Sequence, residues 1–207
     1  MNRYLFFDRI PAMPQCERQQ IQWAYVLAKR WHDGQKRDSG ERYFEHVRCA
    51  ANILIDYGYV DYATIIIAIL HDILEDTCVP VSMLEQLFGP KIARGVLTIS
   101  KTYGIEDPLT GFMTHVPKRT NEEYFASLAR ADTSVILAKC ADRIHNLSGL
   151  VGDMPKDSRW TPEKRVKQVK ETREWILPLA KIHEPRFTEK LENLCAMIEM
   201  NVKAQGK

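Results

Sequence analysis

The stretch that most constrains the fold of this chain lies between residues 61 and 77. Six apolar residues at 65–70 lead without a break into His71-Asp72, and Glu75-Asp76 follow about one helical turn later. Apolar side chains recur at spacings of three and four through residue 74, which is the period of an α-helix. We therefore expect one apolar, buried helix whose C-terminal end is crowded with polar groups.

The rest of the chain has the pattern of further helices separated by Gly and Pro residues. Helical spacing and end signals predict helices over 15–32, 44–57, 82–89, 90–101, 122–131, 133–147, 161 onward with a kink at Pro178, and 187–200. Residues 103–119 and 149–159 are expected to be irregular, and no convincing strand alternation occurs. The predicted fold class is all-α, with residues 1–207 forming a single domain.

Composition and charge exclude several classes of protein. A hydrophobic share of 45% with 27% charged residues is typical of a globular chain with a core. Lys and Arg outnumber Asp and Glu only by 29 to 27, so the net charge of +2 does not indicate nucleic-acid binding. The longest apolar run is far shorter than the about 20 residues that span a bilayer. Scattered cysteines and the lack of a signal-peptide core favour a cytoplasmic protein.

Crowded acids at the end of the apolar helix indicate a cation site. On a helix His71 and Glu75 are neighbours one turn apart, and so are Asp72 and Asp76. Three acids this close together in a partly buried site would raise one another's pKa unless a cation balanced them. The alternative is a solvated helix end with a charged face, which needs no ligand.

Two residues on other predicted helices favour the cation. His46 stands at the start of one helix, and Asp142 lies inside another whose opposite face is apolar. Together with His71 and Asp72 they form a set of nitrogen and oxygen ligands, which suits Mn²⁺, Fe²⁺ or Mg²⁺ better than a structural zinc. His145, three residues beyond Asp142, is interpreted more readily as a core histidine than as a partner of this site.

Three motifs in this order carry a resemblance to a known family. Residues 32–46 have the sequence HDGQKRDSGERYFEH, residues 71–77 HDILEDT, and residues 141–147 ADRIHNL. Their order resembles the HD phosphohydrolase superfamily, and together they look like the hydrolase domain of the RelA/SpoT homologues, over about residues 20–150. In length the chain is similar to the single-domain small alarmone hydrolases. The resemblance implies a single HD-domain helical bundle with a metal site between helices, on which the C-terminal helices at 162–203 pack.

The resemblance also implies an activity. It indicates a Mn²⁺-dependent 3′-pyrophosphohydrolase, with one Mn²⁺ per chain, that converts ppGpp or pppGpp to GDP or GTP and pyrophosphate. The positions that match the metal ligands are His46, His71, Asp72 and Asp142. Glu75 and Asp76 match the acidic pair that positions and deprotonates the attacking water. The expected substrate contacts are Arg37 over the nucleotide, Asn146 at the ribose and 3′ phosphate, and Lys101 at the pyrophosphate, although Lys101 also fits a solvated helix end.

Two positions depart from the family pattern on the nucleotide side of the site. Asp38 stands where the family usually has a second basic residue, and Ser148-Gly149 where an Arg-Thr pair is common. These departures leave open adenine alarmones such as ppApp, or removal of the 2′-phosphate of NADPH. A nucleotide-sensing module without catalysis is a second alternative. The expected partner is a small nucleotide, not nucleic acid or a membrane, and a homo-oligomer is left open.

Overall fold

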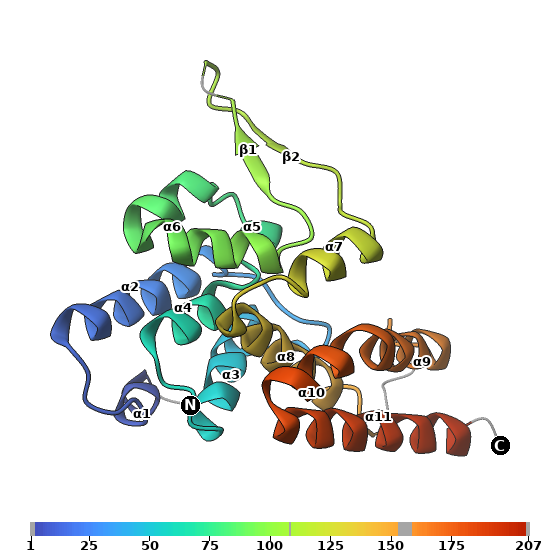
Figure 1. The fold of residues 1–207 in the computed structure, drawn as a ribbon. Coiled ribbons are helices and arrows are strands. Elements are labelled where there is room, and N and C mark those ends of the chain that lie inside the picture. Colours follow the sequence, from blue (N-terminus) through green and yellow to red (C-terminus); the bar gives the residue numbers. More distant parts are fainter. Residues whose placement is uncertain (1–2, 108, 153–158, 206–207) are drawn as a thin grey trace.

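The computed structural model describes residues 3–107, 109–152 and 159–205, and most of these are helical (Figure 1). The helices are α1 (Arg3–Asp8), α2 (Gln15–Trp31), α3 (Tyr43–Asp56), α4 (Tyr62–Leu70), α5 (Ile73–Asp76), α6 (Val81–Ile99), α7 (Asn121–Leu128), α8 (Thr133–Ser148), α9 (Pro162–Glu171), the π-helix η1 (Thr172–Ile176), α10 (Leu177–His183) and α11 (Pro185–Gln205). Within the described ranges the strands β1 (Gly104–Glu106) and β2 (Met113–His115) form a single small sheet. The predicted all-α fold class is confirmed. No helix in the described part of the chain is long and apolar enough to cross a membrane.

Helix α4 is the central helix of the bundle. All its residues except the first are buried, and those at 65–70 are at most 1% exposed. It packs against α2, α3, α6 and α8, so an apolar surface on every side matches its surroundings. Asp61 caps its first turn by accepting a hydrogen bond from the Thr64 N–H at 2.9 Å. The C-terminal end of α4 therefore brings His71 into the interior of the bundle.

The polar end of α4 differs from the continuous helix expected from the sequence. Helix α4 ends at Leu70, and the separate helical turn α5 begins at Ile73. Between them, Asp72 has φ −100° and ψ −3°, in the sparsely allowed bridge region. Its carbonyl oxygen accepts the N–H groups of both Glu75 and Asp76 and so begins the new turn. The prediction of one helix is wrong because the apolar period runs through the joint, whereas the contacts that fix Asp72 come from residues far away in the sequence.

Helix α6 contains a sharp kink at Gly89. This glycine has φ 81°, a conformation that is open to glycine and strained for other residues. Pro90 directly follows and begins the second straight part, so the predicted division into two helical segments is confirmed. Helix α6 begins at Val81 and has no side-chain cap.

The segment at 103–119, expected to be irregular, contains the β-hairpin. Strands β1 and β2 pair antiparallel, with Gly104 opposite His115 and Glu106 opposite Met113. The hairpin projects away from the helices, at the top of Figure 1. Most of its side chains are exposed on both faces. A strand without a buried face shows no apolar alternation, so no local pattern predicts it.

The C-terminal helices pack on α8. Helix α11 lies along α8 and α10, at the bottom of Figure 1. The π-helix η1 directly precedes α10, whose second residue is Pro178, the site of the expected kink. Since proline has no N–H to donate, a local widening of the helix ahead of it is a regular response. The loop expected at 149–159 falls mainly on residues 153–158, which lie outside the described residues.

A buried carboxylate joins the C-terminal helices to the loop after α3. Glu184, between α10 and α11, is 4% exposed. It accepts hydrogen bonds from the Arg186 guanidinium at 2.6 and 2.9 Å and from the Tyr59 hydroxyl at 2.5 Å. The hydrogen bonds from Arg186 lower the pKa of Glu184 to about 2, with help from Tyr59 and against the effect of burial. The charge of Glu184 is therefore part of the folded state.

Candidate metal centre

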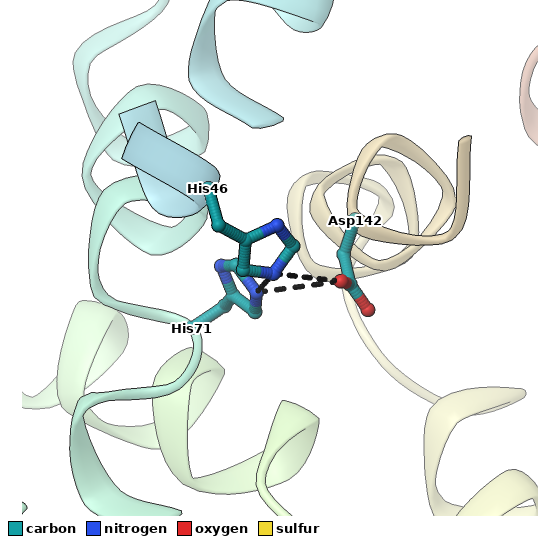
Figure 2. A group of neighbouring side chains, drawn as sticks. All are labelled: His46, His71 and Asp142. Atoms are coloured by element: carbon teal, nitrogen blue, oxygen red, sulfur yellow. Dashed lines mark hydrogen bonds and ion pairs between the residues drawn. The ribbon is translucent and has the colours of Figure 1, made fainter. Parts of the chain in front are cut away.

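Three separate parts of the chain bring a group of ligand-type side chains to one point. His46 lies in the first turn of α3, His71 at the joint between α4 and α5, and Asp142 on α8. All three are buried, and one ligand atom from each lies within 4.8 Å of the others. Figure 2 shows the two imidazoles meeting one carboxylate oxygen of Asp142 across the gap between these elements.

The distances within this group are short and nearly uniform. His46 Nε2 lies 3.2 Å from His71 Nε2. Asp142 Oδ1 lies 3.2 Å from His46 Nε2 and 3.5 Å from His71 Nε2. Asp72 Oδ2 lies 3.4 and 3.1 Å from the same two nitrogens. The structure thus brings together all four residues that were expected to bind metal, and we call this group the four-residue cluster.

The chemistry of the cluster fits a bound cation. His71 Nδ1 lies 2.8 Å from the Ala68 carbonyl oxygen, which can only accept, so this nitrogen carries the proton. In neutral His71 the Nε2 atom is then an acceptor that faces two carboxylate oxygens. Three acceptors directed at one another repel unless positive charge lies between them. Two imidazoles and two carboxylates are suitable ligands for a divalent ion such as Mn²⁺ or Fe²⁺.

Electrostatics also favour positive charge at this point. Burial alone would lower the pKa of His71, but Asp72 and Asp142 raise it well above its ordinary value. Burial would likewise raise the pKa of Asp72, yet His71 and His46 hold it well below its usual range. The pKa of Asp142 is held low against burial by Lys139 first and then by the two histidines. Both carboxylates are therefore charged and available to a cation.

Two further side chains orient the carboxylates of the cluster. The Tyr43 hydroxyl donates to Asp72 Oδ2 at 2.7 Å, and the Lys139 ammonium donates to Asp142 Oδ2 at 2.8 Å. The sequence reasoning missed both residues. A signal was available, because Tyr43 precedes His46 by three residues and Lys139 precedes Asp142 by three, which places each pair on one helix face.

The expected catalytic pair lies on the short helix α5. Glu75 is partly buried, and its Oε1 accepts the Lys101 backbone N–H at 2.6 Å. Burial raises the pKa of Glu75 and the charge of Asp72 raises it further, against the Lys101 hydrogen bond. The Asp76 side chain is exposed as a whole, but part of its carboxyl group is buried. This partial burial raises the pKa of Asp76, and the charge of Asp72 raises it further. A carboxylate with a raised pKa is suited to accept a proton from water near neutral pH.

Two of the expected substrate contacts are linked to the cluster, Asn146 directly and Arg37 through Asn146 and His145. Arg37 donates through Nη2 to Asn146 Oδ1 at 2.7 Å, and its Nη1 lies 3.1 Å from His145 Nδ1. Asn146 Nδ2 donates in turn to Asp142 Oδ1 at 2.5 Å. His145 Nδ1 lies 2.8 Å from His46 Nδ1, so His145 contacts the cluster and is not a separate core residue.

The third expected substrate contact, Lys101, is engaged elsewhere. Its ammonium donates to Asn121 Oδ1 at 2.9 Å and lies 5.0 Å from the centre of the Tyr124 ring. Its backbone N–H, and not its side chain, is the group that meets Glu75.

The two departures from the family pattern have partners within the chain. Asp38 forms an ion pair with Arg159. The Ser148 hydroxyl donates back to the Ile144 carbonyl oxygen at 2.8 Å and so stays on its own helix. His32 is buried and stacks on the Tyr43 ring, with 5.0 Å between the ring centres.

Comparison with known proteins assigns the class that this fold and cluster define. The HD domain family matches residues 24–181, which is most of the chain. The chain therefore belongs to the HD domain family.

Within that class the chain is similar to RelA/SpoT proteins, as its motifs predicted. It is 36% identical over 171 residues to the bifunctional (p)ppGpp synthase/hydrolase SpoT of Escherichia coli K12, covering 81% of this chain and 22% of SpoT. It is 35% identical over 199 residues to the GTP pyrophosphokinase rsh of Brucella ovis, covering 94% of this chain and 24% of that protein. The chain thus spans about a quarter or less of the length of these curated relatives.

A solved structure supports the fold. It is described as a metazoan ortholog of SpoT that hydrolyzes ppGpp, and it matches with a TM-score of 0.69 over 89% of this chain and 96% of that chain. The two sequences are 21% identical, so this likeness concerns the fold alone.

Proposed function

We propose that this chain is a metal-dependent 3′-pyrophosphohydrolase of ppGpp and pppGpp. The observation that carries the proposal is the four-residue cluster, in which two imidazoles and two carboxylates meet at one point beside Glu75. The relatives described above include a synthase/hydrolase and a pyrophosphokinase. A cation site with a carboxylate base next to it favours hydrolysis, because both groups act on water.

The proposed reaction uses the residues as follows. The four-residue cluster would hold one divalent ion, which we propose is Mn²⁺, and a bound ion would lower the pKa of water and offset phosphate charge. Glu75 accepts the proton of the attacking water, and Asp76 helps to position that water. The water oxygen bonds to the phosphorus attached to the ribose 3′ oxygen, and the bond between that phosphorus and the 3′ oxygen breaks. Pyrophosphate leaves, and the 3′ oxygen takes a proton to give GDP or GTP.

Substrate contacts by Arg37, Asn146 and Lys101 stay predictions. Each of these side chains has a partner within the chain, so a nucleotide would have to share or replace those hydrogen bonds. The ion pair of Asp38 with Arg159 places a second guanidinium next to the loop that carries Arg37. This ion pair supports the proposal that a basic group, here Arg159, is kept near position 38, where the family pattern has a basic residue.

We further propose that residues 1–207 act as one domain in the cytoplasm with a nucleotide as the substrate. All five cysteines are free, which suits a reducing compartment. Packing of α10 and α11 on α8 supports a single folding unit, because α8 also carries Asp142.

The test is release of pyrophosphate from ppGpp by the purified chain, with Mn²⁺ and with a chelator. Separate reactions with ppApp and NADPH test the adenine alarmones and the 2′-phosphate alternative. Fast release from ppGpp that needs Mn²⁺ supports the proposal, and His71→Ala should abolish it. Release only from ppApp, or phosphate only from NADPH, would overturn the proposed substrate. Binding of ppGpp without any turnover would indicate the non-catalytic sensing module.

A further inference from the structure

Arg37 stands at the start of two hydrogen-bonded paths that lead to metal-ligating side chains. One path runs from Nη1 through His145 to His46, over distances of 3.1 and 2.8 Å. The other runs from Nη2 through Asn146 to Asp142, over 2.7 and 2.5 Å. One guanidinium is therefore linked to two of the four residues in the cluster, and these two residues lie on different helices, α3 and α8.

The first path decides which nitrogen of His46 can bind a cation. An arginine side chain only donates hydrogen bonds, so His145 Nδ1 must be the acceptor in its contact with Arg37. His46 Nδ1 approaches the same atom at 2.8 Å and must then be the donor. A neutral histidine with its proton on Nδ1 has a free lone pair on Nε2. That is the atom of His46 that faces His71 and Asp142.

The second path fixes the carboxylate. Asn146 Oδ1 accepts from Arg37, which leaves its NH₂ group to donate to Asp142 Oδ1. Lys139 holds the other oxygen, Oδ2. With both oxygens engaged, the carboxylate of Asp142 keeps one orientation toward the cluster.

Main-chain hydrogen bonds fix the backbone of the loop that carries Arg37. The Arg37 N–H donates to the Glu41 carbonyl at 2.8 Å, and the Arg37 carbonyl accepts from Gly40 at 2.9 Å. Residues Lys36 and Arg42 form a β-bridge across the loop. Two parallel N–H groups at a fixed spacing are a property of arginine, and a lysine would supply only a single point of donation.

We propose that Arg37 is a positioning residue for the metal centre, acting on His46 through His145 and on Asp142 through Asn146. The inference rests on the proposed function and deepens it. Arg37 was expected to contact the nucleotide, and here it is assigned to holding the side chains that bind the metal. Removing a group that contacts metal ligands changes metal affinity or activity by about 10- to 100-fold, and Arg37 holds two such groups, His145 and Asn146.

The experiment measures Mn²⁺ affinity by calorimetry, apart from turnover, in variants of the full chain. Arg37→Met and His145→Leu should each weaken Mn²⁺ binding by about 10- to 100-fold. His145→Asn should retain most of the affinity, because an asparagine oxygen can accept near the place of Nδ1. Arg173→Met is the matched control, since Arg173 pairs with Glu199 on the surface. Unfolding temperatures of all variants show whether each one folds, and if His145→Leu does not, Arg37→Met and His145→Asn decide.

Steady-state kinetics separate positioning from nucleotide contact. At saturating Mn²⁺ a positioning residue leaves the KM for ppGpp near the wild-type value. A raised KM with unchanged Mn²⁺ affinity would place Arg37 on the nucleotide and overturn the inference, and so would no change in either quantity. If the wild-type chain binds Mn²⁺ but does not release pyrophosphate, the proposed function fails, while the affinity series still tests the role of Arg37.

Discussion

Replacing Glu75 by glutamine separates the chemical role of this side chain from its structural role. Glu75 Oε1 accepts the Lys101 N–H at 2.6 Å, and a glutamine of the same shape keeps an oxygen at that place. The variant loses only the charge and the ability to take a proton. Glu75→Ala is a poorer test, because it leaves the Lys101 N–H without its partner at a cost of about 1–3 kcal/mol in stability.

The size of the expected effect follows from the role of a general base. Such a group contributes about 10²- to 10⁴-fold, which is about 2.7–5.4 kcal/mol of activation free energy at 1.36 kcal/mol per factor of ten. The kcat for ppGpp at saturating Mn²⁺ should fall by that factor in Glu75→Gln. The Kd for Mn²⁺ should stay close to the wild-type value, because the hydrogen bond of Glu75 goes to the Lys101 amide and not to a ligand.

The stability of the same variant gives an independent control. Burial, and then the charge of Asp72, raise the pKa of Glu75 in the folded chain. An acid whose folded pKa is raised lowers stability once the pH exceeds its unfolded pKa. Glu75→Gln should therefore unfold at a temperature no lower than the wild type at pH 7. The assays are pyrophosphate release, calorimetry and thermal unfolding, with Glu106→Gln on the exposed hairpin as the matched variant. A kcat within about threefold of wild type, well short of the base contribution, would refute the assignment of Glu75 as the base.

Three other changes test the packing of α6 on α4, the charge of Glu184 and the orientation of Asp72 in the cluster. In Gly95→Ala the new β-carbon would lie 2.8 Å from Ile67 Cδ1. The destabilisation by overpacking, about 1–3 kcal/mol, should outweigh the gain of about 0.5–1 kcal/mol in helix stability and lower the midpoint of urea unfolding. A higher midpoint would contradict this prediction. Glu184→Gln should lower the unfolding temperature most at neutral pH. A carboxyl with a folded pKa of about 2 contributes stability above its ordinary pKa of 4.5 and loses that contribution as the pH falls toward 2. A difference in unfolding temperature between variant and wild type that does not shrink on acidification would contradict this prediction. Tyr43→Phe removes the 2.7 Å hydrogen bond to Asp72 and should weaken Mn²⁺ binding, measured by calorimetry, by about tenfold. An unchanged Kd for Mn²⁺ would show that the Tyr43 hydroxyl does not orient the Asp72 carboxylate.

Much of the fold could be predicted because the apolar period identifies most helices directly. The buried helix α4 and the division of α6 at Gly89 both follow from local patterns. The joint at His71-Asp72 could not be predicted, because the same period continues through it into α5. The hairpin strands were missed for the opposite reason, since neither has a buried face that would produce a pattern.

The candidate site divides in a similar way. The positions of His46, His71, Asp72 and Asp142 came from their residue types and motifs, and the structure brings these side chains together. Contacts between distant residues left no local signal. His46 and His145 are 99 positions apart in the sequence, and Arg37 and Asn146 are 109 apart. Only the packing of α3 against α8 and the course of the loop before α3 make those contacts.

The most direct test of the central claim is a Mn²⁺ titration of the metal-free chain, with binding and pyrophosphate release from ppGpp measured at every step. If the four-residue cluster holds the catalytic ion, release is absent before Mn²⁺ is added, rises in proportion to the bound ion and reaches a plateau at one ion per chain. Asp142→Asn should lose both the binding and the release, because Asp142 Oδ1 faces both imidazoles of the cluster. Full release from the metal-free chain, or release that does not follow Mn²⁺ occupancy, would show that the cluster does not hold a catalytic ion.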